Sequence, residues 1–344
     1  MSDALLDRLD PRHYREVAKL ILTKPVIGWV EAGEGAESDN PGAFARYRLL
    51  ARVLRDVSAV STQTTVLGTT VRTPIGIAPI GIQKALHPDG EAGMARGAEQ
   101  AGAILIAPVN STIPIGEVTA AAPGATVWLQ LYNWPDRDAL ADVIRQAEAA
   151  GVKAIVPLVN TPLPASHTPA SVGFRLPAGV TLAHGAGNHD LTAKNDWSYI
   201  SWMAGLTSLP IVPKGIVHPD DALRALDSGA KAILVSNHGN RQVARSVAAV
   251  DALPAVADAV KGRAEVYLDG GVRSGTDALI ALALGARAVF VARAACWGLA
   301  VGGADGVARV LGSLTAELAE DAGMCGIADV TAVPRELIRT VADA

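Results

Sequence analysis

The sequence predicts an α/β protein built as a (β/α)8 TIM barrel, and three observations lead to this prediction. Short strand-like runs occur eight times between residues 75 and 292. Several are almost continuously apolar, as strands are when both faces of a parallel sheet are buried. Helical patterns lie between most of them, and polar residues follow many of them. An open doubly wound sheet is the alternative, but it would show an early glycine-rich turn, and none follows the first run.

The strands are expected at residues 75–78, 104–108, 126–132, 154–159, 210–214, 232–236, 265–269 and 288–292. Helices are expected at residues 10–22, 137–150, 219–228, 247–260 and 276–284. Gly151, Gly229 and Gly285 follow three of these helices. Glycine is typical there, because it adopts the positive φ that ends many helices without strain.

Two segments fall outside this repeat. Residues 1–65 precede the first strand and are expected to form an N-terminal helical cap, with residues 66–344 forming the barrel and C-terminal helices of a single domain. Residues 161–196 follow the fourth strand and are rich in Pro, Gly, Ala and His. A loop of this length in a compact domain is usually a lid, a binding loop or a disordered segment, and this one is expected at the mouth of the barrel.

Composition excludes several classes of protein. Half of the 344 residues are hydrophobic, the net charge is −4, and Lys and Arg form no cluster, which argues against a nucleic-acid partner. No apolar run reaches the ~18 residues that a membrane span needs, and the first residues do not resemble a signal peptide, so a cytoplasmic protein is expected. Cys296 and Cys325 lack metal-ligand spacing, so we expect free thiols and no metal site.

The ends of the expected strands carry the residues that can perform chemistry. They are Asn110, Gln130, Tyr132, Asn160, Lys214, Ser236, His238, Asp269, Arg273 and Arg293. In a barrel these positions converge on one rim, where the active site lies. The glycines of residues 269–275, together with Arg273 and Arg293, are typical of a phosphate site at the last two strands.

The remaining polar groups suit acid–base chemistry beside an anion. A free imidazole titrates near neutrality, so His238 suits proton abstraction from a hydroxyl group, while Arg241 can hold a carboxylate and Tyr132 can donate a hydrogen bond. Gln130 can both donate to and accept from a ring edge. Lys214 suits either charge stabilisation beside a flavin or a Schiff base with a carbonyl substrate.

These residues resemble those of the FMN-dependent α-hydroxy acid oxidases and dehydrogenases, a family that includes glycolate oxidase, lactate oxidase, mandelate dehydrogenase and hydroxymandelate oxidase. The resemblance extends from about residue 20 to about residue 330. Its motifs are Pro74-Ile75-Gly76-Ile77-Ala78-Pro79, Gln83-Lys84-Ala85-Leu86-His87-Pro88, Gln130-Leu131-Tyr132, Pro210-Ile211-Val212-Pro213-Lys214-Gly215, Ser236-Asn237-His238-Gly239, Leu268-Asp269-Gly270-Gly271-Val272-Arg273 and Ala281-Leu282-Ala283-Leu284-Gly285-Ala286.

The resemblance implies FMN as cofactor and assigns a role to each matching residue. His238 would be the catalytic base, Arg241 the carboxylate partner, and Tyr132 a substrate contact. The flavin would contact Pro79, Ile80, Gly81, Pro108, Gln130, Leu158, Lys214 and Ser236. Its phosphate would contact Asp269, Gly270, Gly271, Arg273, Ala292 and Arg293. The reaction would oxidise a 2-hydroxy acid to the 2-oxo acid, with flavin N5 taking the α-hydrogen.

The chain also departs from the family pattern. Trp29 stands where the family has a tyrosine that contacts the substrate carboxylate, and His167 is the nearest counterpart of a second carboxylate-binding arginine. Pro108, Leu158 and Asn160 replace a serine or alanine, a threonine and an aspartate, and Asn240 replaces a small residue. Trp29, Pro108 and Leu158 favour a bulky or aromatic substrate.

Several readings stay open at this stage. The expected substrate is a 2-hydroxy acid, and the alternative is an amine or another non-acid intermediate of specialised metabolism, because Arg241 is the main carboxylate partner left. A non-redox FMN isomerase, a flavin-free aldolase that uses Lys214, and a non-catalytic binding role are further alternatives. The electron acceptor is expected to be oxygen or a carrier, with no membrane partner. The resemblance implies a homo-oligomer, a tetramer.

Overall fold

Eight parallel strands form the barrel in the computed structural model, which describes residues 9–33, 40–163, 173–184, 196–243 and 245–341. Their order is β7-β6-β5-β4-β11-β10-β9-β8, and parallel bridges from Ile155 to Ile211 and from Leu158 to Lys214 join the two ends of this order. The strands are β4 (Ile75–Ile77), β5 (Ile104–Pro108), β6 (Thr126–Leu131), β7 (Ile155–Pro157), β8 (Lys214–Ile216), β9 (Ala232–Val235), β10 (Glu265–Asp269) and β11 (Ala288–Val291). The predicted (β/α)8 barrel is therefore confirmed.

The fifth strand of the barrel differs from its prediction. Residues 210–214 were expected to form it, but β8 begins only at Lys214. Pro210 and Pro213 have no N–H to donate to a strand ladder, so the stretch before Lys214 contributes isolated bridges instead of a continuous strand. Lys214 consequently lies at the start of β8, whereas the sequence placed it at the end.

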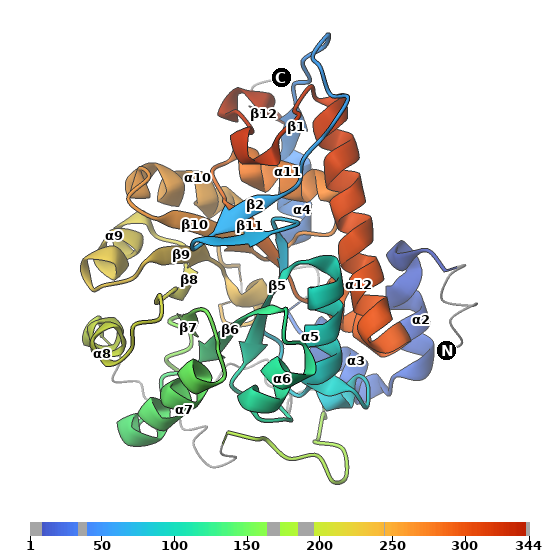
Figure 1. The fold of residues 1–344 in the computed structure, drawn as a ribbon. Coiled ribbons are helices and arrows are strands. Elements are labelled where there is room, and N and C mark those ends of the chain that lie inside the picture. Colours follow the sequence, from blue (N-terminus) through green and yellow to red (C-terminus); the bar gives the residue numbers. More distant parts are fainter. Residues whose placement is uncertain (1–8, 34–39, 164–172, 185–195, 244, 342–344) are drawn as a thin grey trace.

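Helices surround the barrel, as Figure 1 shows. They are α5 (Gly90–Ala101), α6 (Ile115–Ala121), α7 (Arg137–Ala149), α8 (Ser198–Leu206), α9 (Pro219–Asp227), α10 (Ala249–Val260), α11 (Gly275–Ala283) and α12 (Arg293–Met324). The predicted helices at 137–150, 219–228, 247–260 and 276–284 agree with four of these to within two residues. The helix α12 turns sharply at Gly302 and Gly303, where the backbone leaves helical geometry.

The N-terminal part packs as helices against the barrel and then joins the C-terminal part. It contains a 3-10 turn (Pro11–His13), α2 (Tyr14–Ile21), α3 (Lys24–Glu31), α4 (Asn40–Ala43) and a second 3-10 turn (Phe44–Arg46). The strand β1 (Tyr47–Leu49) pairs antiparallel with β12 (Ile338–Thr340). The expected helix at 10–22 is present as the first turn and α2, whereas α3 was not predicted.

A hairpin of β2 (Thr64–Val66) and β3 (Thr69–Val71) follows, and its Val66 and Val71 pack into the inner core of the barrel. The expected boundary between residues 65 and 66 lies inside β2. The aromatic rings of Trp128, Tyr267 and Phe290 fill the same inner core, with ring centroids 5.6–6.0 Å apart. The amino-terminal side of the barrel is thus filled by side chains, which leaves the opposite rim for a ligand.

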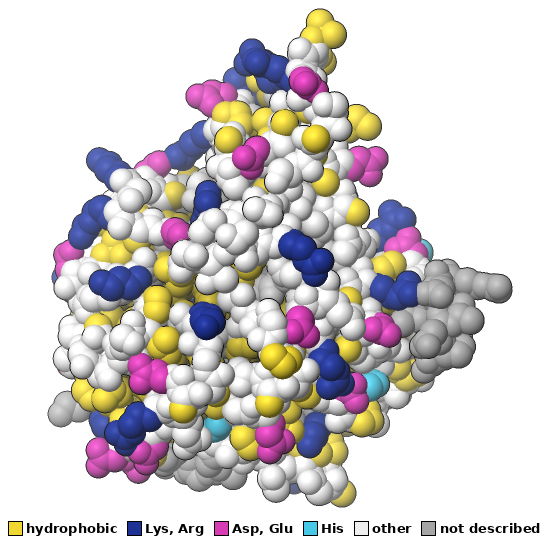
Figure 2. Space-filling model, in the orientation of Figure 1, with side chains coloured by type: hydrophobic (Ala, Val, Ile, Leu, Met, Phe, Trp, Pro, Cys, Tyr) yellow, Lys and Arg dark blue, Asp and Glu magenta, His cyan; other side chains and the backbone are white. Residues whose placement is uncertain are grey.

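Short 3-10 turns complete the described elements, at Gln83–Ala85, His238–Asn240, Val330–Ala332 and Arg335–Leu337. On the face shown in Figure 2, basic and acidic side chains are interspersed and form no cluster of one sign. In the part of the chain that the structure describes, no helix has the length and apolarity needed to cross a membrane. The same residues contain no group of three or more His, Cys, Asp or Glu side chains arranged to hold a metal ion.

Candidate active site

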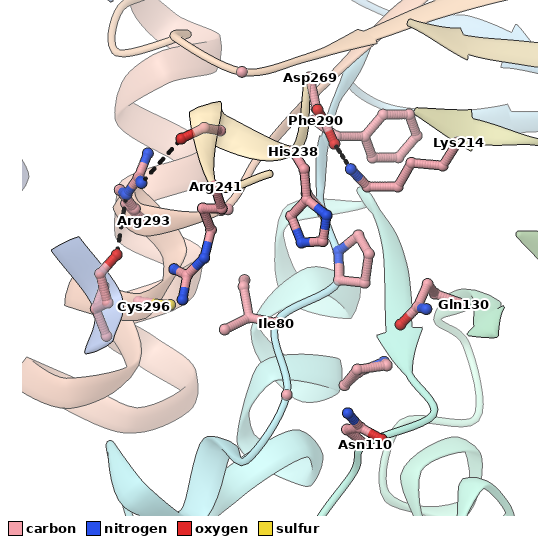
Figure 3. A pocket seen from close by; sticks show the side chains of 18 of the residues that line it. Ile80, Asn110, Gln130, Lys214, His238, Arg241, Asp269, Phe290, Arg293 and Cys296 are labelled. Carbon is pink, nitrogen blue, oxygen red and sulfur yellow. Dashed lines mark hydrogen bonds and ion pairs between the residues drawn. The ribbon is translucent and has the colours of Figure 1, made fainter. Parts of the chain in front are cut away.

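A cavity of about 610 Å³ opens at the carboxyl ends of the strands, and most of the predicted site residues line it. They are Trp29, Pro79, Ile80, Gly81, Pro108, Gln130, Tyr132, Lys214, His238, Arg241, Asp269, Gly270, Gly271, Arg273, Ala292 and Arg293. Figure 3 shows labelled members of this set converging from separate elements. Ser236 and Leu158 do not line the cavity, and His167 lies outside the described residues.

A buried ion pair forms the base of the cavity. Lys214 Nζ lies 2.5 Å from Asp269 Oδ2, and both side chains are almost fully buried. The same ammonium donates to Ser236 Oγ at 2.8 Å, and Ser236 Oγ also accepts from the His238 backbone N–H at 3.0 Å. Ser236 therefore acts from behind the cavity wall, where it connects Lys214 to the turn that carries His238. Leu158 is buried beside Lys214, with which it forms a parallel bridge.

The turn after β9 holds His238 in an unusual backbone conformation. His238, Gly239 and Asn240 have φ values of 59°, 62° and 63°, so three consecutive residues lie in the left-handed region. This region is unfavourable for residues with a Cβ, so other contacts must stabilise it. Asn237 supplies one, because its Oδ1 accepts from the Asn240 N–H at 3.2 Å. Asn40 holds Asn237 in turn through reciprocal amide hydrogen bonds of 2.6 and 2.9 Å.

His238 faces a strongly cationic environment. Burial lowers the pKa of its imidazole well below the usual value, and the charges of Lys214, Arg241 and Arg293 lower it further. A neutral imidazole with a free lone pair is the form that can accept a proton. Burial also raises the pKa of Tyr132, so its hydroxyl group remains a hydrogen-bond donor near neutral pH.

Two arginines bind the carboxyl end of α3. Arg241 Nη1 donates to Trp29 O at 3.0 Å, while Arg293 donates through Nε to Val30 O at 3.0 Å and through Nη2 to Ala32 O at 2.8 Å. The last carbonyls of a helix have no partner within the helix, and cations there also complement the helix dipole. Arg293 thus has a structural role in addition to the phosphate-binding role that the sequence predicts for it. Figure 3 shows both guanidinium groups near Cys296.

Sequence reasoning missed several cavity residues. They include Val30, Ile82, Trp134, Thr161, Leu163, Phe174, Leu176, Leu182, Gln242, Phe290 and Cys296. Phe174 stacks on Trp29 with ring centroids 4.8 Å apart and an interplanar angle of 24°. It comes from the loop expected at the mouth of the barrel, but nothing in the sequence pairs this ring with α3. The two rings form an aromatic wall, which we call the Trp29–Phe174 wall.

Two buried donors in the cavity have no hydrogen-bond partner among the described residues. They are Gln130 Nε2 and Trp134 Nε1. A buried donor without a partner costs free energy, typically about 1–3 kcal/mol, so its presence in a cavity is typical of a group that a ligand satisfies. The cavity therefore offers a deep site with cations and unused donors.

Comparisons with known proteins agree with this geometry. A family model described as FMN-dependent dehydrogenase matches residues 18–340. Human 2-hydroxyacid oxidase 1 is 38% identical over 351 residues, covering 95% of each chain. L-lactate oxidase of Nostoc sp. (strain PCC 7120 / SAG 25.82 / UTEX 2576) is 38% identical over 331 residues, covering 89% of this chain and 91% of that protein.

Solved structures of mandelate oxidase are also similar. One with (S)-2-phenylpropionate superposes with a TM-score of 0.89 at 35% identity, covering 96% of this chain and 98% of that one. A mutant with the C4a-OH-FMN adduct has a TM-score of 0.89 at 36% identity, covering 95% of this chain and 98% of that one.

Proposed function

Because the chain belongs to the FMN-dependent dehydrogenase family, and so is an oxidoreductase with FMN as cofactor, we propose that it oxidises a bulky or aromatic 2-hydroxy acid to the 2-oxo acid. The observation that carries this proposal is the joint placement of His238, Arg241 and the Trp29–Phe174 wall in one cavity. A base, a carboxylate partner and an aromatic surface are the three features such a substrate requires.

The residues present fit FMN. The cavity volume of about 610 Å³ lies within the range of small-molecule sites, roughly 300–1,000 Å³. The unpartnered Gln130 Nε2 can donate to a ring carbonyl, and the Lys214 ammonium can lie beside a ring edge that gains negative charge. Gly270 and Gly271 line the cavity with φ values of 98° and 92°, and their backbone N–H groups could donate to a phosphate, which Arg273 could neutralise.

When bound, FMN accepts the α-hydrogen and two electrons from the substrate. The chain's own residues accept the hydroxyl proton and hold the substrate. His238 takes the hydroxyl proton, Arg241 binds the carboxylate, and Tyr132 donates a hydrogen bond to the carboxylate or to the oxygen that becomes the carbonyl. The Trp29–Phe174 wall packs against the substrate side group and excludes water.

Three of the other readings have less support. The relatives of this chain are oxidases, so a non-redox isomerase is not favoured. A protonated Schiff base at Lys214 would keep a single N–H, which cannot donate to both Asp269 and Ser236, so an aldolase is not favoured either. Oxidation of an amine would leave Arg241 without a carboxylate partner.

Anaerobic flavin reduction tests the proposal. The purified protein is mixed without oxygen with aliphatic and aromatic 2-hydroxy acids and with the matching amines, and the flavin absorbance is followed. We expect aromatic acids to bleach the flavin faster than lactate or glycolate, and amines to leave it unchanged. Flavin that no 2-hydroxy acid reduces, or that an amine reduces faster, would contradict the proposal.

The acceptor and the assembly are further parts of the proposal. Readmitting air after bleaching should restore the yellow colour within the time of one turnover, because we propose oxygen as acceptor on the basis of the oxidase relatives. We also propose a cytoplasmic homo-oligomer, and sedimentation of the holoenzyme tests its oligomeric state.

A further inference from the structure

The side chain of Gln242 contacts the ring of His238 within the cavity. Its amide nitrogen lies 3.2 Å from His238 Nδ1, and Gln242 itself lines the cavity. The two residues are four positions apart on the turn after β9, which the Asn40–Asn237 amide pair holds in place. The contact is thus fixed by the same backbone that places His238.

This contact decides which nitrogen of His238 can act as a base. A neutral imidazole carries one proton, and the nitrogen without it is the acceptor. If the Gln242 NH2 group donates to Nδ1, then Nε2 carries the proton and cannot accept another. If the amide is turned so that Oε1 accepts from Nδ1–H, then Nε2 is free. The oxygen and nitrogen ends of an amide are assigned from chemistry, and a base at Nε2 requires the second orientation.

The charges around His238 make its contact with the Gln242 side chain more important. The neighbouring charged groups are the cations Lys214, Arg241 and Arg293, and Asp269 is engaged by Lys214. Within the described ranges, no carboxylate forms a hydrogen bond or ion pair with the His238 ring. Asn160, which replaces an aspartate of the family pattern, lies against Gly215 and does not line the cavity. A neutral amide is therefore the ring's side-chain partner.

We propose that Gln242 is the positioning residue of His238: its side-chain oxygen accepts the Nδ1 proton and so keeps Nε2 free for the substrate hydroxyl proton. The inference rests on the proposed role of His238 as base. In the step that follows, the substrate O–H bond breaks and its proton forms an N–H bond at Nε2, giving an imidazolium that keeps its proton on Nδ1 and donates it in a hydrogen bond to Gln242 Oε1.

Two variants test the proposal in the holoenzyme. Gln242→Leu keeps a similar volume without the acceptor, and Gln242→Glu keeps the shape and adds a negative charge. We expect Gln242→Leu to slow flavin reduction about 10- to 100-fold, a part of the ~10²–10⁴-fold that a general base contributes. We expect Gln242→Glu to stay active, with the acid limb of its pH profile moved to higher pH by about one unit, because a nearby negative charge favours the imidazolium.

A second readout does not depend on turnover. Nitrogen NMR of histidine-labelled holoenzyme, with the His238 signal assigned by its loss in His238→Asn, reports which ring nitrogen carries the proton. We expect protonated Nδ1 in the unchanged protein and protonated Nε2 in a substantial fraction of Gln242→Leu. The exposed Gln146 on α7 supplies the control, and Gln146→Leu should change neither readout.

The outcomes separate the two proposals. If His238→Asn still reduces its flavin at the normal rate, the base role fails. If His238→Asn is inactive but Gln242→Leu keeps both the tautomer and the rate, the positioning role alone fails. Protonated Nε2 in the unchanged protein would also overturn the positioning role. Flavin absorbance of each variant shows whether it has folded and bound FMN.

Discussion

Arg241 is the residue on which the proposed acid specificity of the site depends. It donates one guanidinium N–H to Trp29 O, which leaves further N–H groups for a ligand in the cavity. The other cations at this rim have different partners: Lys214 is paired with Asp269, and Arg293 binds the carbonyls of Val30 and Ala32. A buried guanidinium remains charged despite its lowered pKa, so Arg241 favours an anionic group.

Replacing Arg241 with Met should therefore lower the activity on acid substrates selectively. A hydrogen bond to a charged group contributes about 1.5–3 kcal/mol, so kcat/KM for the 2-hydroxy acid should fall about 10- to 150-fold. The amide of the same acid has no negative charge, and its kcat/KM should change several-fold at most. Flavin reduction by the two substrates, in both proteins, gives the comparison. Equal losses for acid and amide would mean that Arg241 does not bind the carboxylate.

Prediction from sequence worked best for residues at strand ends. Asp269 ends β10 and His238 is the third residue after β9, so a barrel places both at the same rim. Phe174 and Trp134 could not be found in this way, since the first lies in a long loop and the second beyond the end of β6. Their positions depend on packing between distant segments. Gln242 follows His238 and Arg241 closely in the sequence, and this proximity could have identified it as a candidate site residue.

At the scale of elements, α3 supports the side of the cavity that is proposed to bind the substrate. Its terminal carbonyls bind Arg241 and Arg293, and the chain then turns at Gly33 with φ of 81°. A Cβ at Gly33 would lie 2.8 Å from Arg241 Cγ and 2.8 Å from Gly239 O. Such contacts are too short for carbon, so the turn requires glycine for both its conformation and its space.

Gly33→Ala should therefore displace Arg241, and Gly68→Ala provides a matched control. Gly68 has a similar φ of 77°, but a Cβ there would meet nothing within 4 Å. Both variants should lose roughly 1 kcal/mol of stability from the backbone conformation, and Gly33→Ala should lose more because its Cβ also clashes with Arg241 and Gly239. Only Gly33→Ala should also raise KM for the acid, by about tenfold or more. Thermal unfolding and steady-state kinetics measure the two effects, and identical kinetics in both variants would refute this role of Gly33.

The described part of the long loop is attached to the barrel through His184. Its Nε2 accepts from the Ile115 N–H at 3.2 Å, while the Ala183 N–H donates to Ser111 O at 2.9 Å. Burial lowers the pKa of His184, because the charged imidazolium loses water there. A protonated Nε2 can no longer accept a hydrogen bond, so this attachment depends on the neutral ring.

The attachment should accordingly weaken in acid. A group whose folded pKa is lowered contributes its stability above the unfolded pKa, about 6.5 for histidine, and loses it progressively as the pH falls below that value. Hydrogen exchange of the Ile115 amide, corrected for intrinsic rates, should therefore increase below about pH 6.5. The buried helix residue Val118 serves as reference. His184→Gln should remove the pH dependence, and its persistence in that variant would assign it to another group.

Predicted elements failed where proline or short length weakened the pattern. The fifth strand was placed too early because its run looked continuous, although Pro210 and Pro213 interrupt the ladder. The helix α3 has only eight residues and contains Gly28, so its pattern was weak. Its Pro25 at the start was the signal that could have revealed it, since proline is favoured in the first helical turn.

At the scale of the whole molecule, the barrel brings together segments that are far apart in the chain. The cavity takes residues from α3, from the strand ends and from residues 173–184, while β1 and β12 pair the two ends of the fold. Periodicity and strand count were sufficient to predict the architecture, because each barrel unit repeats the same local pattern. The Trp29–Phe174 wall and the arginine contacts to α3 are long-range contacts, which a local pattern does not encode.

The cavity is assembled from segments that are far apart in the chain, so FMN should bind the folded protein and stabilise it. A ligand that binds only the folded state adds RT ln(1 + [L]/Kd), or about 2.7 kcal/mol at a hundred times Kd. FMN should therefore raise the midpoint of thermal unfolding of the apoprotein strongly. Riboflavin lacks the phosphate that Arg273, Gly270 and Gly271 are proposed to bind, so it should raise the midpoint less.

Arg273→Met tests where the phosphate binds. In this variant the advantage of FMN over riboflavin should shrink, because a charge-assisted hydrogen bond of about 1.5–3 kcal/mol is lost for FMN alone. Arg145→Met is the control, since Arg145 forms an exposed pair with Asp142 on α7 and such pairs contribute little. Calorimetric scans of each apoprotein with either flavin give the comparison. If FMN and riboflavin stabilise the unchanged protein equally, the rim at β10 and β11 does not bind the phosphate.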